Sequence, residues 1–301
     1  MIDRASTFAD PEIVNLLKTK FVPVAINQAY QRQQKDAEGE LYRKIAGQGP
    51  RKNFNNTTQG FYIATPSGDL LLYNNNRDVE KVRRLMQQKL SEFTARPAST
   101  AEVVDTKAIK LDPRFNTNLP EGGLVVRVRA KVLEGYEPTT DRFETIFQTA
   151  LSRDNLWTST VEHESLVKGT VPASLQERIA RFHLVDNTRG EPPMWSKDEI
   201  RKLDMKLASG KLTGTVHLET KSGDRGYTAE LLGVVETKDD KVVRFDVVAL
   251  GEFWGEGQFT GNAPKGKFPL AIAFTLADDS DVADKLPPQG SRGWLQGYLP
   301  R

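Results

Sequence analysis

The sequence predicts a two-domain chain in which an N-terminal α/β unit precedes an α+β unit built on an antiparallel β-meander. Three observations support this prediction. The length of 301 residues suits two domains of ordinary size. Helix patterns flank a hairpin pattern in residues 8–93. Short polar connections separate three consecutive strand patterns in residues 211–250, and such short connections join antiparallel neighbours.

The composition limits the classes of function. The 42 basic and 40 acidic residues give a formal charge of +2, which argues against a protein that mainly neutralises nucleic-acid phosphates. The absence of cysteine excludes disulfides, thiolate catalysis and cysteine-bound metals, and it leaves the compartment open. There is no apolar run of about 18 residues, so we expect no membrane span. We also expect no signal peptide, because the start lacks a basic segment followed by an apolar one.

The N-terminal unit begins with a predicted helix over residues 8–19. Asp10 can cap this helix, and Pro11 suits its first turn because the N–H that proline lacks would be unpaired there. Residues 21–26 form a short apolar run that is typical of a buried strand. The polar stretch over residues 28–46 predicts a loop that leads into a second helix.

A predicted hairpin and helix follow. Residues 61–64 and 70–73 are apolar runs on either side of a Pro-Ser-Gly turn, and this arrangement predicts a β-hairpin. Asp78 can cap the next helix, which extends to about residue 93. One side of that helix is apolar and the other carries lysines and arginines, so we expect its apolar side to belong to the core.

The order of these elements resembles the second half of the thioredoxin-like fold over residues 5–92. The match is best in STFADPEIVNLLKTKFVPVAIN and GFYIATPSGDLLLY. The family places a Cys-x-x-Cys pair just ahead of a segment like the one at Ser6 and Thr7, and this chain has no cysteine. The family also places a cis-proline about seven residues before the hairpin proline, Pro66, and this chain has Gln59 there. Ser6, Thr7 and Gln59 are therefore degenerate thioredoxin positions.

The resemblance implies a redox-inactive chain, because a thiolate is the nucleophile in thiol–disulfide exchange. It also implies that the central first strand of the fold lies upstream, or that the rest of the chain or a partner supplies it. An unpaired strand edge attracts other chains. The resemblance therefore favours a non-catalytic subunit or protein-interaction role, with a protein partner or self-association and no cofactor. A thiol oxidoreductase whose Cys-x-x-Cys lies upstream is an alternative.

We assign residues 1–94 to the first domain, residues 95–120 to a linker, and residues 121–301 to the second domain. Residues 123–133 alternate between apolar and polar positions and predict a half-buried strand with a basic outer face. Residues 141–151 predict a helix. Further strands are expected at residues 157–161, 211–220, 227–236, 241–250 and 268–276. A helix is expected at residues 197–203, after the cap Ser196. Residues 174–182 could form either a helix or a strand.

Polar residues share one face of the expected meander. His217 and Glu219 lie on the same face of their strand, and Arg244 and Asp246 would lie nearby on that face in simple register. An imidazole, carboxylates and a guanidinium can bind a small ligand or a metal, or perform acid–base catalysis. The alternative is the ordinary solvated face of an antiparallel sheet.

The other polar motifs give weaker signals. One short stretch contains residue types that can bind a metal ion: Glu162, His163 and Glu164. Neighbouring side chains on a strand point to opposite faces, so the three would not converge on one ion. We therefore predict a solvated polar strand or loop and no metal site. His183 is expected to be structural. The glycine-rich stretch over residues 251–257 lacks the Lys-Ser/Thr of a phosphate loop, so we expect a turning strand end. These patterns favour a binding protein over an enzyme.

Overall fold

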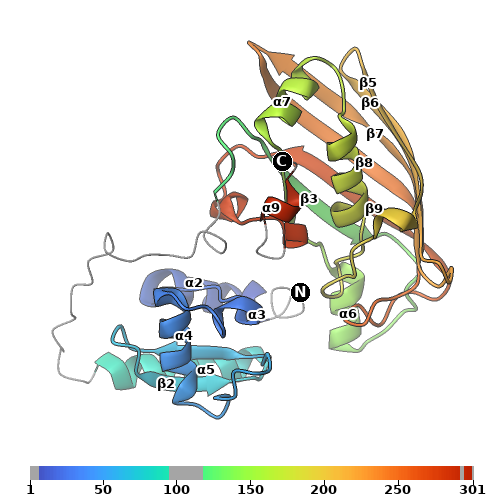
Figure 1. Ribbon diagram of the computed structural model, residues 1–301. Coiled ribbons are helices and arrows are strands. Elements are labelled where there is room, and N and C mark those ends of the chain that lie inside the picture. Colours follow the sequence, from blue (N-terminus) through green and yellow to red (C-terminus); the bar gives the residue numbers. More distant parts are fainter. Residues whose placement is uncertain (1–6, 95–117, 292–294, 300–301) are drawn as a thin grey trace. The chain divides into compact units, whose positions relative to one another are not determined.

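The computed structural model describes residues 7–94, 118–291 and 295–299. The chain divides into two compact units, Asp3–Asn116 and Thr117–Arg301, named here the N-terminal unit and the C-terminal unit (Figure 1). Both units mix helices with strands that pair antiparallel. No helix in the described parts has the length and apolar character that crossing a membrane requires. Most of the predicted linker lies outside the described residues.

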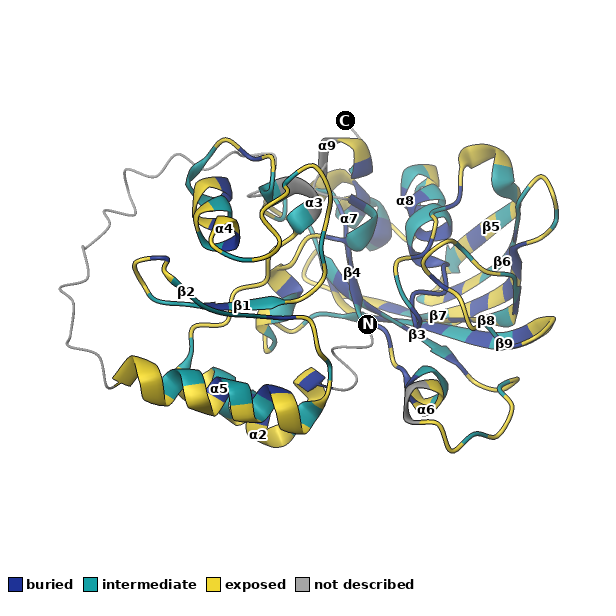
Figure 2. Ribbon diagram, turned by 90° about the horizontal axis from the view of Figure 1, so that it is seen from below, coloured by how far each residue is buried: buried dark blue, intermediate teal, exposed yellow. Residues whose placement is uncertain are grey.

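The N-terminal unit contains one hairpin between helices. Its elements are the 3-10 turn η1 (Thr7–Ala9), α2 (Pro11–Lys20), α3 (Gln28–Gln31), α4 (Ala37–Gly47), β1 (Phe61–Ala64), β2 (Leu70–Asn74) and α5 (Val79–Thr94). β1 and β2 pair antiparallel, which confirms the predicted hairpin. α4 lies on one face of the hairpin, and α2 and α5 lie on the other (Figure 2).

Alternation along β1 divides the core of this unit. Ile63 belongs to a buried cluster with Ile13 of α2 and Val82 of α5. The neighbouring side chain, Tyr62, meets Tyr42 of α4 in an edge-to-face ring contact. Successive side chains of a strand point to opposite faces, so this short hairpin binds helices on both sides.

The prediction of a strand over residues 21–26 is wrong. This stretch follows α2 as neither helix nor strand. A strand needs a neighbouring strand to satisfy its backbone N–H and C=O groups, and within the described residues β1 and β2 pair only with each other. The apolar pattern of a strand is present, but the pairing that would make it one is not.

The C-terminal unit is built on a seven-stranded antiparallel sheet. Its strands are β3 (Val125–Val132), β4 (Asp154–Trp157), β5 (Ile200–Ala208), β6 (Lys211–Glu219), β7 (Gly226–Lys238), β8 (Lys241–Trp254) and β9 (Lys267–Leu276). The spatial order is β4-β3-β9-β8-β7-β6-β5, so the last strand of the unit pairs with the first. The predicted meander, the strand at 123–133 and the strand at 268–276 are confirmed.

Some helices of this unit cover one face of the sheet (Figure 2). The helical elements are α6 (Arg142–Thr149), α7 (Thr160–Val167), α8 (Ala173–Arg178), the π-helical turn η2 (Ile179–His183), the 3-10 turns η3 (Lys197–Glu199), η4 (Val282–Lys285) and η5 (Gln289–Ser291), and α9 (Leu295–Tyr298). α7 and α8 lie on the same face (Figure 2). Leu166 of α7 and Leu175 of α8 belong to one buried cluster with the inner side chains of the strands, among them Phe245 and Phe274. The core therefore lies between the sheet and these helices.

The predicted strand at 157–161 is displaced. β4 ends at Trp157, and α7 begins at Thr160. The side chain of Ser159 accepts from the N–H of Glu162, and the Glu162 carboxylate accepts from the N–H of Ser159. This capping box starts a helix, so His163 lies on a helix and not on the expected polar strand or loop. The ambiguous stretch at 174–182 is helical.

The predicted helix over residues 197–203 is wrong. Ser196 does form a capping box, but it starts only the short turn η3. β5 follows, and it turns Leu203, Met205 and Leu207 toward the core. Apolar side chains at every second residue therefore decide the structure here, and the helix-cap signal does not. Pairing with β6 places the face that carries these apolar side chains in the core.

Candidate functional site

His217 and Glu219 form a pair on the outer face of β6. The distance from Nε2 of His217 to Oε2 of Glu219 is 3.5 Å, and the two side chains are 37% and 33% exposed. Arg244 forms a second group on β8, with its Nε 2.6 Å from Oδ2 of Asp246 and its Nη1 3.0 Å from Oε1 of Glu236. Half of the Arg244 side chain is exposed, so water screens these ion pairs.

The structure does not bring the two groups together. On β7, Thr228 lies opposite His217, and Val234 lies opposite Asp246. Positions 228 and 234 are separated by six residues, which corresponds to about 20 Å along a strand. The four residues chosen from the sequence therefore form two separate pairs on a polar sheet face. This separation removes the basis for a single ligand site that uses all four.

Glu162 and His163 of α7 make structural contacts. The N–H of Val242 donates to Nε2 of His163 at 3.1 Å, and Nδ1 of the same ring lies 2.8 Å from the carbonyl oxygen of Gly122. Glu162 is buried and accepts two hydrogen bonds from Arg178, at 2.7 and 2.6 Å. Across the part of the chain that the structure describes, no cluster of three His, Asp or Glu side chains could hold a metal ion.

Thr7 and Gln59, two of the positions that the resemblance singled out, meet at Arg77. The hydroxyl of Thr7 donates to the backbone oxygen of Arg77 at 2.7 Å, and the Arg77 guanidinium donates to the side-chain oxygen of Gln59 at 3.0 Å. The backbone oxygen of Gln59 also accepts from the hydroxyl of Tyr73 at 2.5 Å. Ser6 lies outside the described residues. These contacts hold the loop between β2 and α5.

The outer edge of β1 has no partner strand among the described residues of this unit. β1 pairs with β2 along one edge, and no strand within residues 7–94 pairs with the other edge. The stretch after α2 exposes three apolar side chains: Val22 is 89% exposed, Val24 72% and Ile26 37%. Folded proteins usually cover both an unpaired strand edge and a run of exposed apolar side chains.

Contacts tie both ends of this stretch to residues in or just before β1. Phe21 and Phe61 pack against the buried cluster that contains Ile13. At the other end, the N–H of Thr58 donates to Oε1 of Gln28 at 2.6 Å. Residues 22–26 and the unpaired edge of β1 together are called the open strip below. It is the candidate interaction site of the N-terminal unit.

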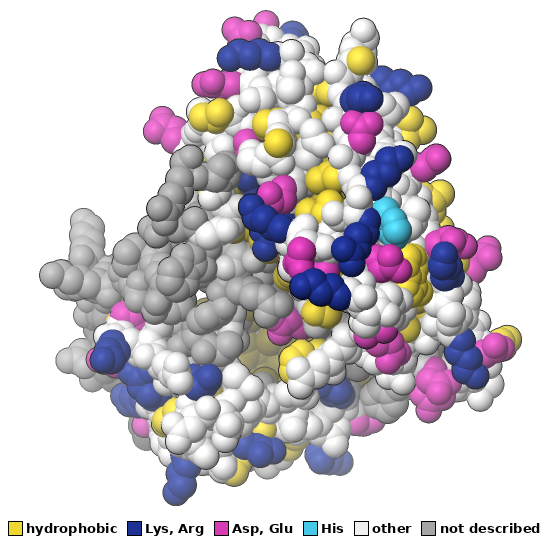
Figure 3. All heavy atoms as spheres, turned by 45° about the vertical axis from the view of Figure 1, so that its right-hand side comes forward, with side chains coloured by type: hydrophobic (Ala, Val, Ile, Leu, Met, Phe, Trp, Pro, Cys, Tyr) yellow, Lys and Arg dark blue, Asp and Glu magenta, His cyan; other side chains and the backbone are white. Residues whose placement is uncertain are grey.

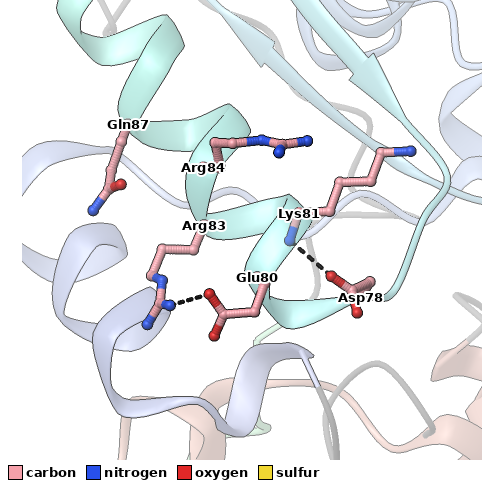
Figure 4. Close-up of a pocket in the computed structure, with 6 residues that line it drawn as sticks. All are labelled: Asp78, Glu80, Lys81, Arg83, Arg84 and Gln87. Atoms are coloured by element: carbon pink, nitrogen blue, oxygen red, sulfur yellow. Dashed lines mark hydrogen bonds and ion pairs between the residues drawn. The ribbon is translucent and has the colours of Figure 1, made fainter.

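A depression of about 380 Å³ lies along the start of α5. It is lined by Asp78, Glu80, Lys81, Arg83, Arg84 and Gln87 (Figure 4). Arg83 forms ion pairs with Glu80 of the same helix and, at 2.6 Å, with Glu12 of α2. Lys81 and Arg84 extend away from that pair and are exposed (Figure 4). Ion pairs stabilise the charge of Arg83, and water solvates the charges of Lys81 and Arg84.

Polar residues of β4 hold the C-terminal part of the chain. Nδ2 of Asn155 donates to the backbone oxygens of Ala283 and Leu286, at 2.7 and 2.9 Å. Oδ1 of Asp154 accepts from the N–H of Gln289 at 2.8 Å. β4 is the edge strand of the sheet, so these contacts protect an otherwise unpaired edge.

Asp154 also joins a buried group around His183. Nδ1 of His183 lies 3.1 Å from Oδ2 of Asp154, and Nε2 lies 2.6 Å from the hydroxyl of Tyr298. Burial raises the pKa of the Tyr298 hydroxyl. The order carboxylate, imidazole and hydroxyl is that of an activated nucleophile, but these side chains are almost fully buried, so a substrate has no access to them. Sequence reasoning missed this group because its members lie far apart along the chain.

On the face of the molecule shown in Figure 3, acidic and basic side chains are interspersed. A nucleic-acid-binding surface would instead carry its basic side chains in one cluster. Among protein families, curated proteins and solved structures, no match to this chain is found.

Proposed function

We propose that the chain is a non-catalytic protein-interaction subunit whose N-terminal unit accepts an extended strand of a partner protein in the open strip. The observation that carries the proposal is the unpaired edge of β1 together with the exposed Val22 and Val24. An added strand would satisfy the free backbone N–H and C=O groups of β1. Its side chains would also cover the apolar ones.

The thioredoxin-like resemblance supports the same site. In that fold the first strand is central, and it would lie between residues 21–26 and β1. A strand in this position would have α4 on one face and α2 and α5 on the other. Strands that are buried on both faces are apolar throughout. The expected partner segment is therefore extended, uncharged and rich in Val and Ile, with about four to six residues.

A second copy of this chain is the competing occupant of the open strip. β1 is a short strand of four residues, so two β1 edges would share few hydrogen bonds. An apolar segment that contacts both β1 and residues 22–26 would bind with a more favourable free energy, because it also buries the exposed valines. The proposal therefore assigns the open strip to a different protein.

The test is amide hydrogen exchange in the full chain, with and without a soluble peptide that carries a Val/Ile-rich core. We expect the peptide to slow exchange in residues 61–64, because alternate N–H groups of an edge strand gain a partner. The same peptide with a central proline lacks a donor there and should protect less. Equal protection by both peptides, or by neither, would exclude strand addition.

Variants locate the binding surface. Val22→Asp combined with Val24→Asp should weaken peptide binding at least tenfold, because the strip would then offer charge to an apolar ligand. Val161→Asp is the matched control, since Val161 on α7 is 69% exposed and lies in the other unit. Equal affinity of the double variant and the native chain would contradict the proposal. Light scattering across a range of protein concentrations would reveal self-association instead.

A further inference from the structure

The segment after β9 carries three aspartates at a spacing of three residues. Asp278, Asp281 and Asp284 lie before and within the 3-10 turn η4. Asp284 is buried, whereas Val282 of the same turn is 83% exposed. The turn therefore directs a carboxylate inward and an apolar side chain into the solvent. This is the reverse of ordinary core packing.

Two arginines bind these carboxylates. Arg127 of β3 donates from Nε and Nη2 to the two oxygens of Asp284, at 2.9 and 2.7 Å, and it also pairs with Asp278. Arg153, just before β4, donates from Nη2 to Asp284 at 2.6 Å and pairs with Asp281. Two-pronged pairing of guanidinium with carboxylate is both strong and specific in geometry.

Two neighbouring side chains of β4 bind the backbone of the segment. The Asn155 amide donates to the backbone oxygens of Ala283 and Leu286, and the Asp154 carboxylate accepts from the N–H of Gln289. Arginines that bind spaced carboxylates and side chains that bind the backbone are the two components of acidic-peptide recognition. Leu286 is 56% exposed, so the segment is held mainly by polar contacts.

The fit leaves polar atoms of the surface unused. Oδ1 of Asn155 and Nε of Arg153 are buried, and within the described residues neither has a hydrogen-bond partner. A buried polar atom without a partner costs stability. A different peptide could supply the missing donor and acceptor, so the segment of this chain is not the best possible occupant.

We propose that Arg127, Arg153 and Asn155 form an acidic-peptide groove, which the chain's own segment 278–289 occupies, and that the groove takes an acidic segment of a partner protein in its place. The recognised pattern is three carboxylates at a spacing of three residues, as in Asp278, Asp281 and Asp284. The covalently attached segment competes at a high effective concentration. A partner binds when its segment fits better or when the attached segment is weakened.

The test uses a fluorescently labelled peptide with the sequence of residues 277–290, added to the full chain and followed by anisotropy. Weak binding is expected for the native chain, because its own segment fills the groove. The triple variant Asp278→Asn, Asp281→Asn and Asp284→Asn should bind the peptide at least tenfold more tightly. Adding Arg153→Gln to the triple variant should abolish that gain. A peptide of the same composition with adjacent carboxylates is the matched control and should bind less well.

Two results would overturn the proposal. The first is equal binding of the ordered and the rearranged peptides. The second is no gain in the triple variant while its circular dichroism remains native, which would make the segment a fixed part of the fold. If the triple variant does not fold, Asp281→Asn alone serves, because it retains Asp284. A gain of about threefold is then expected, and no gain in that folded variant also overturns the proposal.

Discussion

At the scale of single residues, Glu162 and Arg178 form a buried ion pair. Their side chains are 2% and 5% exposed, and Ser174 donates a further hydrogen bond to the carboxylate at 2.7 Å. Burial opposes ionisation of Glu162, but hydrogen bonds from Arg178, Ser159 and Ser174 outweigh it, and they hold the pKa of Glu162 below its usual value. The pair also links α7 to α8.

Glu162→Gln should lower the free energy of unfolding by about 3–5 kcal/mol at pH 7, because it leaves the Arg178 charge buried without a counter-ion. Urea unfolding followed by circular dichroism measures this change. The matched control is Glu236→Gln, whose exposed pair with Arg244 should cost less than about 1 kcal/mol. Equal effects of the two substitutions would contradict this account of the buried pair.

The effect of Glu162→Gln should depend on pH with a defined sign. The pKa of Glu162 is lower in the folded chain than the value of about 4.3 expected in the unfolded chain. Its contribution to stability is therefore complete above about pH 4.3 and is lost as the pH falls through the lower folded-state value. The difference between the native chain and the variant should shrink below that pH.

At the scale of elements, a single side chain protects the free edge of β5. Gln176 of α8 accepts from the N–H of Met205 at 3.2 Å and donates to its backbone oxygen at 3.3 Å. The side-chain amide thus takes the place of a neighbouring peptide group. The exposed Lys202 and Lys206 also discourage another strand from pairing there.

Gln176→Ala should cost about 1–3 kcal/mol, because the N–H and C=O of Met205 lose their partner. It should also allow edges of two molecules to pair, so light scattering should show self-association that grows with concentration. Gln87→Ala on the exposed surface of α5 is the matched control and should change neither property. A fully monomeric Gln176→Ala variant with native stability would show that the amide has no protective role.

At the scale of the whole molecule, the two units differ in the size of their cores. Among the described residues, four buried ones form the cluster of the N-terminal unit, whereas the cluster of the C-terminal unit draws on the sheet, α7 and α8. Stability grows with the apolar surface that folding buries. The N-terminal unit is therefore expected to be the less stable one when the open strip has no occupant.

Amide hydrogen exchange of the full chain tests this order. Amides of β1 and α5 should exchange through openings of lower free energy than those of the central strands β7 and β8. Ile13→Ala should speed exchange further in β1 and α5, because it leaves a cavity in the small cluster. Slower exchange in β1 than in β7 would contradict the expected order.

Local patterns predicted the elements that satisfy their own hydrogen bonds or pair with a sequence neighbour. The Asp10 side chain accepts from two N–H groups at the start of α2, as its position suggested. The hairpin of β1 and β2 and the meander from β6 to β8 also follow from local patterns. The cap at Ser196 misled the prediction at β5, because a turn and a helix share that signal.

The sequence by itself determined periodicity, caps and turns, since these depend on residues only a few positions apart. Tertiary structure decided whether an apolar run became a strand. Residues 200–208 form a strand because β6 pairs with them, whereas residues 21–26 do not form one. It also decided which charges meet. Arg127 and Arg153 reach Asp284 across 157 and 131 residues of chain, and the four polar residues of the meander separate into two groups. Arg127 and Arg153 meet Asp284 because elements that lie far apart in the sequence pack together, and a pattern of neighbouring residues does not encode that packing.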